Sequence, residues 1–489
     1  MARLVFALLC AAALLAQQPA EVRISSGRIS GQDTGEVRSW LGIPYAAPPT
    51  GELRWKPPRP APAWSGVRAM DKFGPPCMQS ARAGLPEPSE DCLTLNVWAP
   101  KTGSKLPVMV WIHGGAFRTG SASMPIYDGT SLARKGVVLV SIQYRLGDFG
   151  FFAHPELTKE AAGGPTGNFG LMDQVAALEW VRANIAAFGG DPGNVTIFGE
   201  SAGGASVLTL MGSPKARGLF HRAISQSGGG GQAGRDLAAL EKHGERLASD
   251  LGAADLKALR AMPAREILAR AKPVDLGAYG PVVDGIYVTA PVRQVFAEGR
   301  QAPVPFLVGA NSFEASLMKS FNVTAERVAA FTGGGRPIIR KLYGDDEEQA
   351  ARELFGDALF VGPARFLAAR MSQVRQPAYL YHFSYVLEQR RGQVPGAAHG
   401  SEIPFVFDNL DRSPFGKLLT EADRKMASIM SRYWVQFART GDPNVNGLPK
   451  WPAYDAAGDK LLEFGADIAV RAKFRAAKLD FLDNLRLPR

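Results

Sequence analysis

Hydrophobic residues in this chain form short unbroken runs, separated by segments in which they recur every three or four positions. The unbroken runs are rich in Val, Ile, Leu and aromatic residues, which is typical of strands buried on both faces. They lie at 106–112, 137–144, 195–198, 304–310 and 378–386. Residues 94–98 and 222–227 are further strand candidates.

The segments between these runs have the spacing of helices. In residues 168–188 the apolar positions follow a three- and four-residue repeat, formed by Leu171, Val175, Leu178, Val181 and Ile185. Gly189-Gly190 ends this helix, and a turn is predicted at 191–193. Helices are also predicted within 236–273, 325–375 and 420–440. Buried strands that alternate with helices predict an α/β fold with a large, mostly parallel central sheet and helices on both faces.

One predicted strand runs into a turn that carries a candidate nucleophile. Gly199-Glu200-Ser201-Ala202-Gly203 follows the run at 195–198, and helical spacing resumes after it. Strand, sharp turn and helix with G-x-S-x-G at the turn form the nucleophile-elbow pattern, in which a strained serine presents its hydroxyl above the sheet. Gly199 and Gly203 lack the Cβ atoms that would collide where strand and helix pass closely. We predict Ser201 as nucleophile; the alternative is a chance match in a chain with 54 glycines.

A serine nucleophile needs a general base, and six histidines are available. His399 lies on a glycine-containing loop after the last strong strand, which is where an α/β-hydrolase carries its base. His382 lies within a predicted strand and is expected to be packed. His113 precedes a glycine pair and is expected to shape that loop. Surface roles are expected for His154, His221 and His243. We predict His399 as the base.

The base in turn needs an acid that orients it. Glu314 directly follows the strand at 304–310 and precedes His399, which matches the chain order serine, acid, histidine. Asp284 and Glu402 remain alternatives to Glu314. An ordinary loop carboxylate is the other interpretation of Glu314.

An oxyanion is stabilised by backbone N–H groups that point at one spot. The strand at 106–112 is followed by His113-Gly114-Gly115-Ala116-Phe117, which fits the HGGG-type loop. We predict the N–H groups of Gly115, Ala116 and Ala202 as donors, each worth ~10²–10³ in rate. Gly114 and Glu200 are predicted to support them.

Length and charge exclude several other classes of protein. The chain has 489 residues and is 46% hydrophobic, enough for a large core, and no internal repeat or low-complexity linker divides it. Its net charge of +10 is spread among acidic residues without a long basic run, so nucleic-acid binding is not expected. The proline-rich segment at 442–454 is expected to wrap over the surface.

Residues 1–20 are predicted to be a secretory signal peptide. Arg3 precedes an apolar run from Leu4 to Ala16 that is too short to span a bilayer, and Ala16 or Ala20 is small enough for cleavage. No other stretch approaches ~18 uninterrupted apolar residues, so no membrane span is expected. We predict a single domain over 21–489, secreted or periplasmic.

Cysteine usage agrees with export. Loss of Cys10 with the signal peptide leaves Cys77 and Cys92, fifteen positions apart. Two such cysteines in an exported chain favour one disulfide, with free thiols as the alternative. Because no other cysteines or clustered histidines are present, we expect no metal site, and no cofactor is expected.

Several long blocks together resemble one known family. The chain is similar to the type-B carboxylesterases, the cholinesterase-like branch of the α/β-hydrolases, and among them to the bacterial para-nitrobenzyl-esterase type. The matching blocks cover nearly the whole predicted mature chain: SEDCLTLNVW (89–98), VMVWIHGGAF (108–117), YRLGDFGF (144–151), the run from 167 to 204, GAAHGSEIPFVF (396–407) and LPKWPAY (448–454).

The resemblance implies a function and a set of roles. It implies a serine esterase with the triad Ser201, Glu314 and His399, the same three oxyanion donors, and a disulfide between Cys77 and Cys92. It further implies that Ser227 is a buried serine that supports the histidine loop. Two buried ion pairs are implied as well: Arg54 with Glu90, and Arg145 with Asp173. The expected substrate is a small-molecule ester.

The chain also departs from the family pattern. The loop between Cys77 and Cys92 contains no aromatic residue, so the cation–π platform that cholinesterases place there is absent and a choline-ester preference is not expected. Ala116 replaces the third glycine of many relatives, and ANSFEA lacks the usual glycine after Glu314. Two other functions remain alternatives: an acyltransferase or lactonase on the same fold, or a non-catalytic adhesion module. The sequence gives no indication of oligomeric state.

Overall fold

A computed structural model describes residues 20–230, 235–270, 279–330 and 336–486. Its centre is a 13-stranded sheet among these residues, in the order β1-β2-β3-β5-β7-β6-β8-β9-β12-β13-β14-β15, with β4 (Val67–Ala69) beside β2. Seven neighbouring strands run parallel: β7 (Val138–Ile142), β6 (Leu106–Ile112), β8 (Gly190–Glu200), β9 (Arg222–Gln226), β12 (Phe306–Asn311), β13 (Ala378–Phe383) and β14 (Lys460–Phe464). These parallel strands include the buried runs of the sequence, because strands covered on both faces need no polar alternation.

The first strands form an antiparallel extension of the sheet. They are β1 (Ala20–Ile24), β2 (Gly27–Asp33), β3 (Val37–Pro44) and β5 (Thr94–Pro100), and β15 (Ile468–Ala472) ends the opposite side. The buried carbonyl of Ala20 accepts a hydrogen bond of 2.8 Å from the Trp40 indole. The predicted domain boundary at 21 therefore lies one residue inside the sheet, and residues 1–19 of the predicted signal peptide lie outside the described residues.

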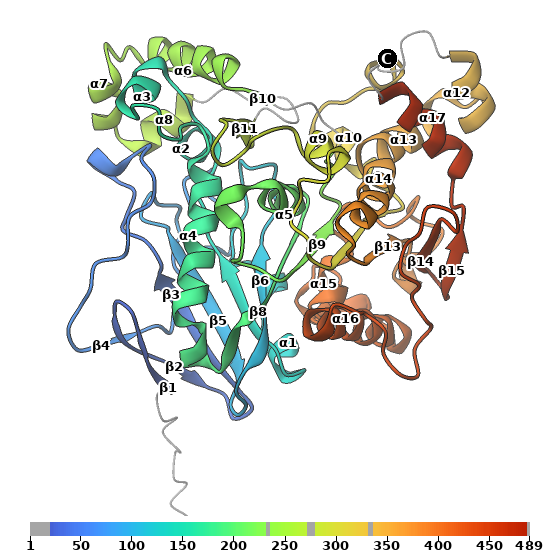
Figure 1. Ribbon diagram of the computed structural model, residues 1–489, viewed down its shortest axis with the longest axis horizontal. Coiled ribbons are helices and arrows are strands. Elements are labelled where there is room, and N and C mark those ends of the chain that lie inside the picture. The colour runs from blue at the N-terminus through green and yellow to red at the C-terminus, as the bar shows by residue number, and fades with distance from the viewer. Residues whose placement is uncertain (1–19, 231–234, 271–278, 331–335, 487–489) are drawn as a thin grey trace, which may run out of the picture.

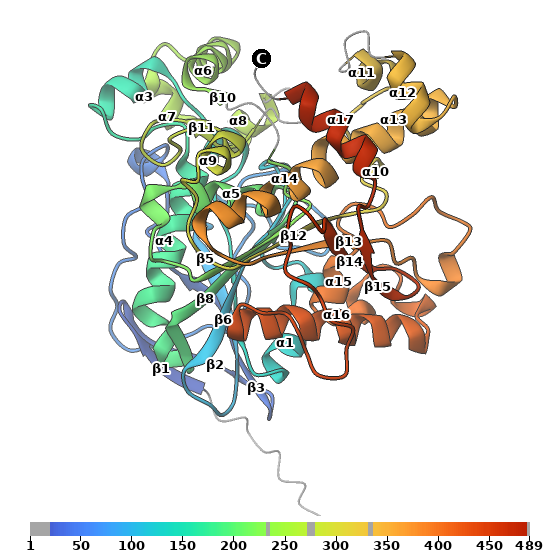
Figure 2. The ribbon, with the colours of Figure 1, turned by 45° about the vertical axis from the view of Figure 1, so that its right-hand side comes forward.

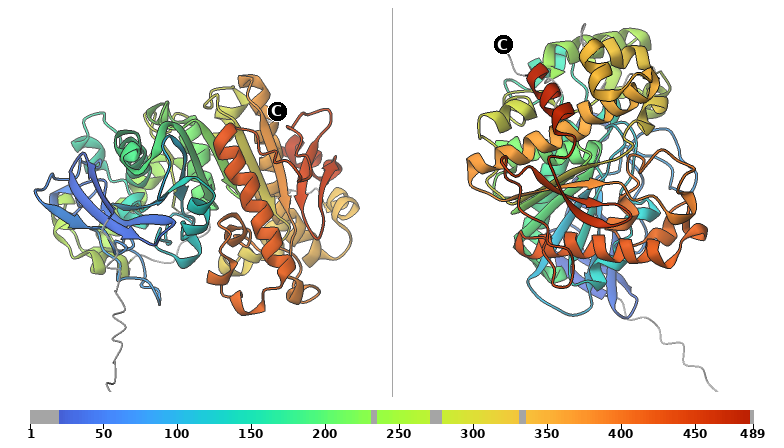
Figure 3. Two further views of the ribbon diagram at one scale, coloured as in Figure 1. Left: turned by 90° about the horizontal axis from the view of Figure 1, so that it is seen from below. Right: turned by 90° about the vertical axis from the view of Figure 1, so that its right-hand side faces the viewer.

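Helices cover both faces of the sheet (Figure 2, and the right-hand view of Figure 3). On one face lie α4 (Phe169–Asn184), α5 (Ala202–Gly212) and α14 (Gly362–Arg370); on the other lie α1 (Thr130–Arg134) and α16 (Glu421–Thr440). Alternate residues of β6 enter the two cores, Val108 and Val110 on the first face and Met109 and Trp111 on the second. This alternation follows from the two-residue repeat of a strand.

Two groups of helices extend beyond one end of the sheet, at the upper left and the upper right of Figure 1. The first contains α6 (Leu237–Leu251), α7 (Leu256–Ala261) and α8 (Ala264–Arg270), together with α3 (Pro155–Glu160). The second contains α10 (Ser316–Ser320), α11 (Ala325–Ala330), α12 (Arg336–Tyr343), α13 (Glu347–Gly356) and α17 (Ala476–Arg486). A π-helical turn, η5 (Asp357–Val361), joins α13 to α14.

Two of the predicted local structures differ from the observed ones. The turn expected at 191–193 is part of β8, whose pairing with β6 shifts register between Leu106 and Val108. The segment expected to wrap over the surface contains Trp451, which is fully buried and donates a 3.0 Å hydrogen bond to the Leu380 carbonyl. Its indole fills the second core, so this segment packs as part of the interior.

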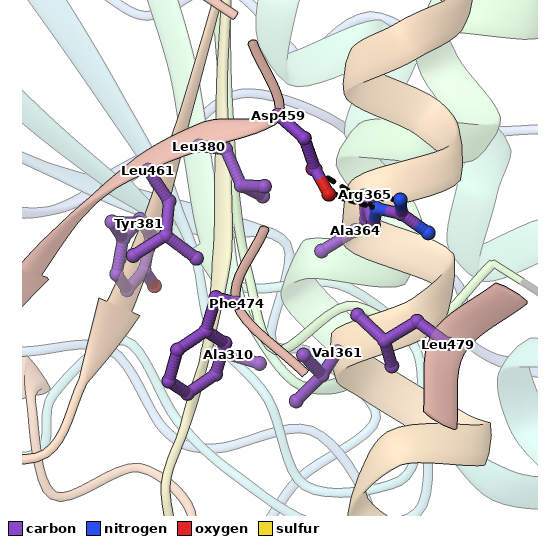
Figure 4. Close-up of a pocket in the computed structure, with 10 residues that line it drawn as sticks. All are labelled: Ala310, Val361, Ala364, Arg365, Leu380, Tyr381, Asp459, Leu461, Phe474 and Leu479. Carbon is purple, nitrogen blue, oxygen red and sulfur yellow. Dashed lines mark hydrogen bonds and ion pairs between the residues drawn. The ribbon is translucent and has the colours of Figure 1, made fainter. Parts of the chain in front are cut away.

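The C-terminal segment is joined to α14 by a partly buried charge pair (Figure 4). Arg365 on α14 donates to both carboxylate oxygens of Asp459, at 3.0 and 2.8 Å, and Tyr454 donates to the same carboxylate at 2.9 Å. Apolar side chains from β12, β13 and β14 surround this contact and leave a void of only about 10 Å³ beside it. The last strands are thus fixed by a charge contact as well as by the sheet.

The disulfide and both ion pairs implied by the family resemblance are present. Cys77 and Cys92 are bonded. Arg54 contacts Glu90 at 2.6 Å, and Arg145 binds both carboxylate oxygens of Asp173 at 2.8 Å with both side chains almost fully buried. Removing one partner of such a pair leaves an uncompensated buried charge, so both are expected to be costly to break.

Candidate active site

Ser201 occupies a sharp turn between β8 and α5. Its backbone angles are φ 56° and ψ −122°. This conformation is energetically unfavourable for any residue other than glycine. Two hydrogen bonds hold it there: its N–H donates to the Gln226 carbonyl at 2.9 Å, and its carbonyl accepts from the Ala205 N–H at 2.8 Å. The predicted strand–turn–helix arrangement is therefore the observed one.

The two flanking glycines permit the close approach that the turn needs. A Cβ on Gly199 would lie 2.6 Å from the backbone of Gly203, and a Cβ on Gly203 would lie 1.9 Å from the Ile112 carbonyl oxygen. Both distances are far below van der Waals contact with backbone atoms that have no room to move. Gly203 is thus required because the first turn of α5 lies directly against the end of β6.

His399 and Glu314 lie next to each other on two loops. The Glu314 carboxylate is 2.5 Å from His399 Nδ1, and the His399 N–H donates to the Ser316 hydroxyl at 3.0 Å. Glu314 is 1% exposed. Its other oxygen accepts hydrogen bonds from the Asn311 N–H at 2.7 Å and from the Ser227 hydroxyl at 2.6 Å. Ser227 therefore holds the acid rather than the histidine loop itself, which differs from the role implied by the resemblance.

The two alternative acids have other partners. Asp284 accepts from the N–H groups of residues 286–288 and from Asn168, so it closes a turn. Glu402 accepts from the side chains of Gln226 at 3.0 Å and Asn311 at 2.5 Å. Glu402 thus ties the segment after His399 to β9 and β12. Burial, together with the charge of Glu200, raises the pKa of Glu402 to about 7.

Glu200 faces the other nitrogen of His399. Its Oε1 lies 3.0 Å from Nε2, which is close enough for an ion pair when the imidazole is protonated. Burial alone would lower the pKa of His399, but the negative charges of Glu200 and Glu314 outweigh it and hold the pKa well above its ordinary value. Phe360 of η5 packs on the imidazole with ring centres 5.3 Å apart.

Ser201 and His399 both line one cavity of about 640 Å³. No hydrogen bond joins their side chains in the part of the chain that the structure describes. Catalytic hydrogen bonds are often long in an empty site and shorten when substrate binds, so this spacing is compatible with proton transfer.

The loop after β6 presents free N–H groups to the same cavity. Gly115, Ala116 and Phe117 all have positive φ, at 112°, 56° and 57°. This backbone turns the carbonyl of Gly115 inward, where it accepts from the N–H groups of Arg118 and Thr119. Among the described residues, the N–H groups of Gly115, Ala116 and Ala202 have no acceptor, and all three residues line the cavity. A Cβ on Gly114 would lie 2.7 Å from the Glu200 carbonyl, so this glycine lets the loop approach the elbow.

The other five histidines lie outside this cavity and contact other parts of the fold. His113 is fully buried, which lowers its pKa to about 4, and its carbonyl accepts from the Tyr144 hydroxyl. Burial likewise lowers the pKa of His382 to about 4. His154 begins α3 and His221 accepts from a backbone N–H. His243 is less superficial than predicted, because it contacts the buried carboxylate of Asp148 at 2.8 Å.

The wall of the cavity is mostly apolar and comes from distant parts of the chain. Gly228, Leu317 and Phe360 line it from the loop after β9, from α10 and from η5. The segment from 279 to 292, which carries Tyr279 and Val288 to the cavity, was not predicted to line a pocket. That segment has neither a motif nor a strong period, so only its tertiary position reveals it.

Two negative findings concern the described residues only. No helix among them has the length and the apolar character of a membrane span. They contain no cluster of histidine, cysteine and acidic residues arranged to hold a metal ion. The expected absence of a metal and of a cofactor stays a prediction.

Comparison with known proteins gives consistent relatives. The pattern of the Carboxylesterase family matches residues 18–332 and 339–482. Fumonisin B1 esterase of Sphingopyxis macrogoltabida is 38% identical, with 91% of this chain and 86% of that protein covered. Para-nitrobenzyl esterase of Bacillus subtilis is 36% identical, with 91% and 94% covered.

Solved structures agree with the fold. A structure titled PNB esterase matches with a TM-score of 0.83 at 34% identity, and a Geobacillus stearothermophilus carboxylesterase with 0.84 at 36% identity. Each covers 94% of this chain and 99% of the other. The predicted α/β-hydrolase fold is thereby confirmed, as is the resemblance to type-B carboxylesterases. With the family pattern matched along almost its whole length, this chain belongs to the carboxylesterase family and is a carboxylic ester hydrolase.

Proposed function

We propose that this chain hydrolyses small carboxylic esters through an acyl-enzyme formed on Ser201. His399 takes the proton of the Ser201 hydroxyl as it attacks the ester carbonyl, and Glu314 orients the imidazole. The alcohol leaves with that proton. Water, deprotonated by the same histidine, then releases the acid.

The observation that carries this proposal is the convergence of three groups on one cavity. Ser201, His399 and the free N–H groups of Gly115, Ala116 and Ala202 all face it. Donors fixed before substrate arrives stabilise the charge that develops on the carbonyl oxygen without reorganisation. The 2.5 Å contact between Glu314 and His399 supports the proposed role of the acid.

The cavity supports a substrate of moderate size. A volume of about 640 Å³ lies within the usual range for small-molecule sites, and the mostly apolar wall favours an ester with an apolar acyl or alcohol group. We further propose that the protein is exported, which the disulfide between Cys77 and Cys92 supports.

The test is hydrolysis of a series of p-nitrophenyl acyl esters by the wild type and by Ser201→Ala. We expect the variant to lose about 10⁴-fold or more in kcat, because the oxyanion donors alone leave only a small residual rate. A burst of p-nitrophenol equal to the enzyme concentration would reveal the acyl-enzyme. A folded variant that keeps most of its activity would exclude Ser201 as nucleophile. Acyl transfer to an added alcohol, faster than hydrolysis, would instead favour a transferase.

A further inference from the structure

The cavity that contains Ser201 has a cation on its wall for which the proposed chemistry has no use. Arg118 follows the oxyanion loop, and among the residues that line the cavity in the described part of the chain it is the one lysine or arginine. Its guanidinium makes no ion pair, hydrogen bond or ring contact with any described residue.

The negatively charged group on the cavity wall already has a partner other than Arg118. Glu200 is the one described carboxylate on that wall, and it lies 3.0 Å from His399 Nε2. Apart from these groups the wall is mostly apolar, with hydroxyl-bearing side chains from Thr119, Ser201, Thr209, Ser227, Tyr279 and Ser320. Within the described parts of the chain, Arg118 therefore lies at a mostly apolar cavity and has no carboxylate partner.

The backbone holds Arg118 at this position. The turn that frees the Ala116 N–H is closed by the hydrogen bond from the Arg118 N–H to the Gly115 carbonyl, at 3.1 Å. Phe117, the residue just before Arg118, packs edge-on against Phe151 with ring centres 5.0 Å apart. Its carbonyl accepts a hydrogen bond from the Gly147 N–H at 2.7 Å. The same loop that carries the proposed oxyanion donors thus fixes the start of the side chain of Arg118, which is exposed to solvent and lines the cavity.

We propose that Arg118 is a specificity-determining residue and that the preferred substrates are esters with a carboxylate at a distance from the scissile bond. This rests on the proposed ester hydrolysis at Ser201. The apolar wall binds the body of the ester, and the guanidinium pairs with the carboxylate at the open side. Arginine suits this role because its planar fork binds a carboxylate with two parallel hydrogen bonds.

The test compares esters that differ only in one charge. On the acyl side, mono-p-nitrophenyl suberate is paired with the corresponding p-nitrophenyl suberamate, in which an amide replaces the free carboxylate. On the alcohol side, 4-octanoyloxybenzoate is paired with 4-octanoyloxybenzamide. The wild type, Arg118→Gln and Arg118→Lys are measured on all four, with kcat and KM separated.

We expect the wild type to have the lower KM for the carboxylate in at least one pair. Arg118→Gln should raise that KM about fivefold or more while changing kcat and the amide KM less than about twofold; the effect is modest because an exposed pair remains hydrated. Arg118→Lys should keep most of the preference. Raising salt from about 20 mM to about 500 mM should weaken the preference of the wild type and leave Arg118→Gln unchanged.

Arg432→Gln is the matched control. Arg432 is an exposed arginine on α16, on the other face of the sheet, and its replacement changes the net charge by the same amount. The proposal is overturned if neither pair shows a preference, if Arg118→Gln affects the charged and neutral esters alike, or if Arg432→Gln has the same effect. Activity on the neutral esters that depends on Ser201, without any dependence on Arg118, would leave the proposed hydrolysis intact. Absence of all hydrolysis would instead contradict the proposed function.

Discussion

At the scale of single residues, His399 lies between the carboxylates of Glu314 and Glu200. A histidine between two carboxylates is held protonated to a higher pH than a free one, because both negative charges stabilise the imidazolium. Glu314 contacts Nδ1, where it orients the ring, whereas Glu200 lies beside Nε2, the nitrogen that would take the serine proton. Glu200 was predicted only as a supporting residue. In the structure its negative charge raises the pKa of His399.

The first prediction follows from this contact. The base must be neutral, so activity is lost as the pH falls through the pKa of His399. Glu200→Gln removes one of the charges that raise this pKa. We therefore expect the acidic limb of kcat/KM to move to lower pH by about one unit or more, as measured in full pH profiles of both proteins.

Glu421→Gln is the control for the loss of one negative charge, since Glu421 is exposed at the start of α16. Its acidic limb should coincide with that of the wild type. An unshifted limb in Glu200→Gln would mean that Glu200 does not set the pKa of the base. A lower plateau with an unshifted limb would point to a purely structural role.

At the scale of elements, the site depends on how closely α5 approaches the end of β6. The helix starts directly after Ser201, and Gly203 in its first turn lies against the Ile112 carbonyl. The oxyanion loop begins one residue after Ile112. The same contact therefore sets the distance between Ser201 and the proposed oxyanion donors.

The second prediction tests this contact with Gly203→Ala. The added Cβ would lie 1.9 Å from the Ile112 oxygen, so β6 and α5 must separate. We expect a loss of about 3 kcal/mol or more in the free energy of unfolding, at the upper end of overpacking costs. Activity should fall about 10²-fold in any folded fraction, because a shift near 1 Å misplaces reacting groups. Chemical denaturation and p-nitrophenyl ester assays measure the two effects.

Gly212→Ala, at the other end of the same helix, provides the comparison. There the added Cβ would meet only the side chain of Val295, at 3.2 Å, which is able to adjust. Its stability should stay within about 1 kcal/mol of wild type. Equal effects at the two glycines would contradict the argument from close approach.

At the scale of the whole molecule, the N-terminal strands and the disulfide bear on export. Ala20 is the first residue of β1, and its carbonyl binds the Trp40 indole inside the core. Cleavage after Ala16 keeps this contact, whereas cleavage after Ala20 removes it. We therefore propose Ala16 as the cleavage site of the predicted signal peptide.

The third prediction concerns the exported protein. Produced with its leader in a host that secretes through such signals, the full chain should appear outside the cytoplasm with its N-terminus directly after Ala16, as N-terminal sequencing would detect. It should contain no free thiol until reduced. Replacing both Cys77 and Cys92 by serine should lower the free energy of unfolding by about 3 kcal/mol, because the disulfide closes a loop with a sequence separation of 15. Cytoplasmic protein with two free thiols would contradict export.

Much of this fold was predictable because the local signals agree with the tertiary packing. The strands at 106–112 and 378–386 are β-rich runs covered on both faces, and the helix at 168–188 ends at glycine, as observed. The strands β14 and β15 were not predicted, since they are short, partly exposed and lack a strong pattern. Trp451 was misjudged because the composition of its segment indicates a loop, while burial depends on what lies beneath it.

The sequence by itself determined the family, the fold and the candidate residues Ser201, Glu314 and His399, because motifs fix backbone turns and residue types locally. Only the tertiary structure decided which groups meet: Ser227 with Glu314, Glu200 with His399, and Arg118 with an apolar cavity. Electrostatic and packing interactions act over a few ångströms in space. The residues that interact here lie far apart in the chain, and no sequence spacing links them. Which of these residues contact each other is therefore known only from the folded structure.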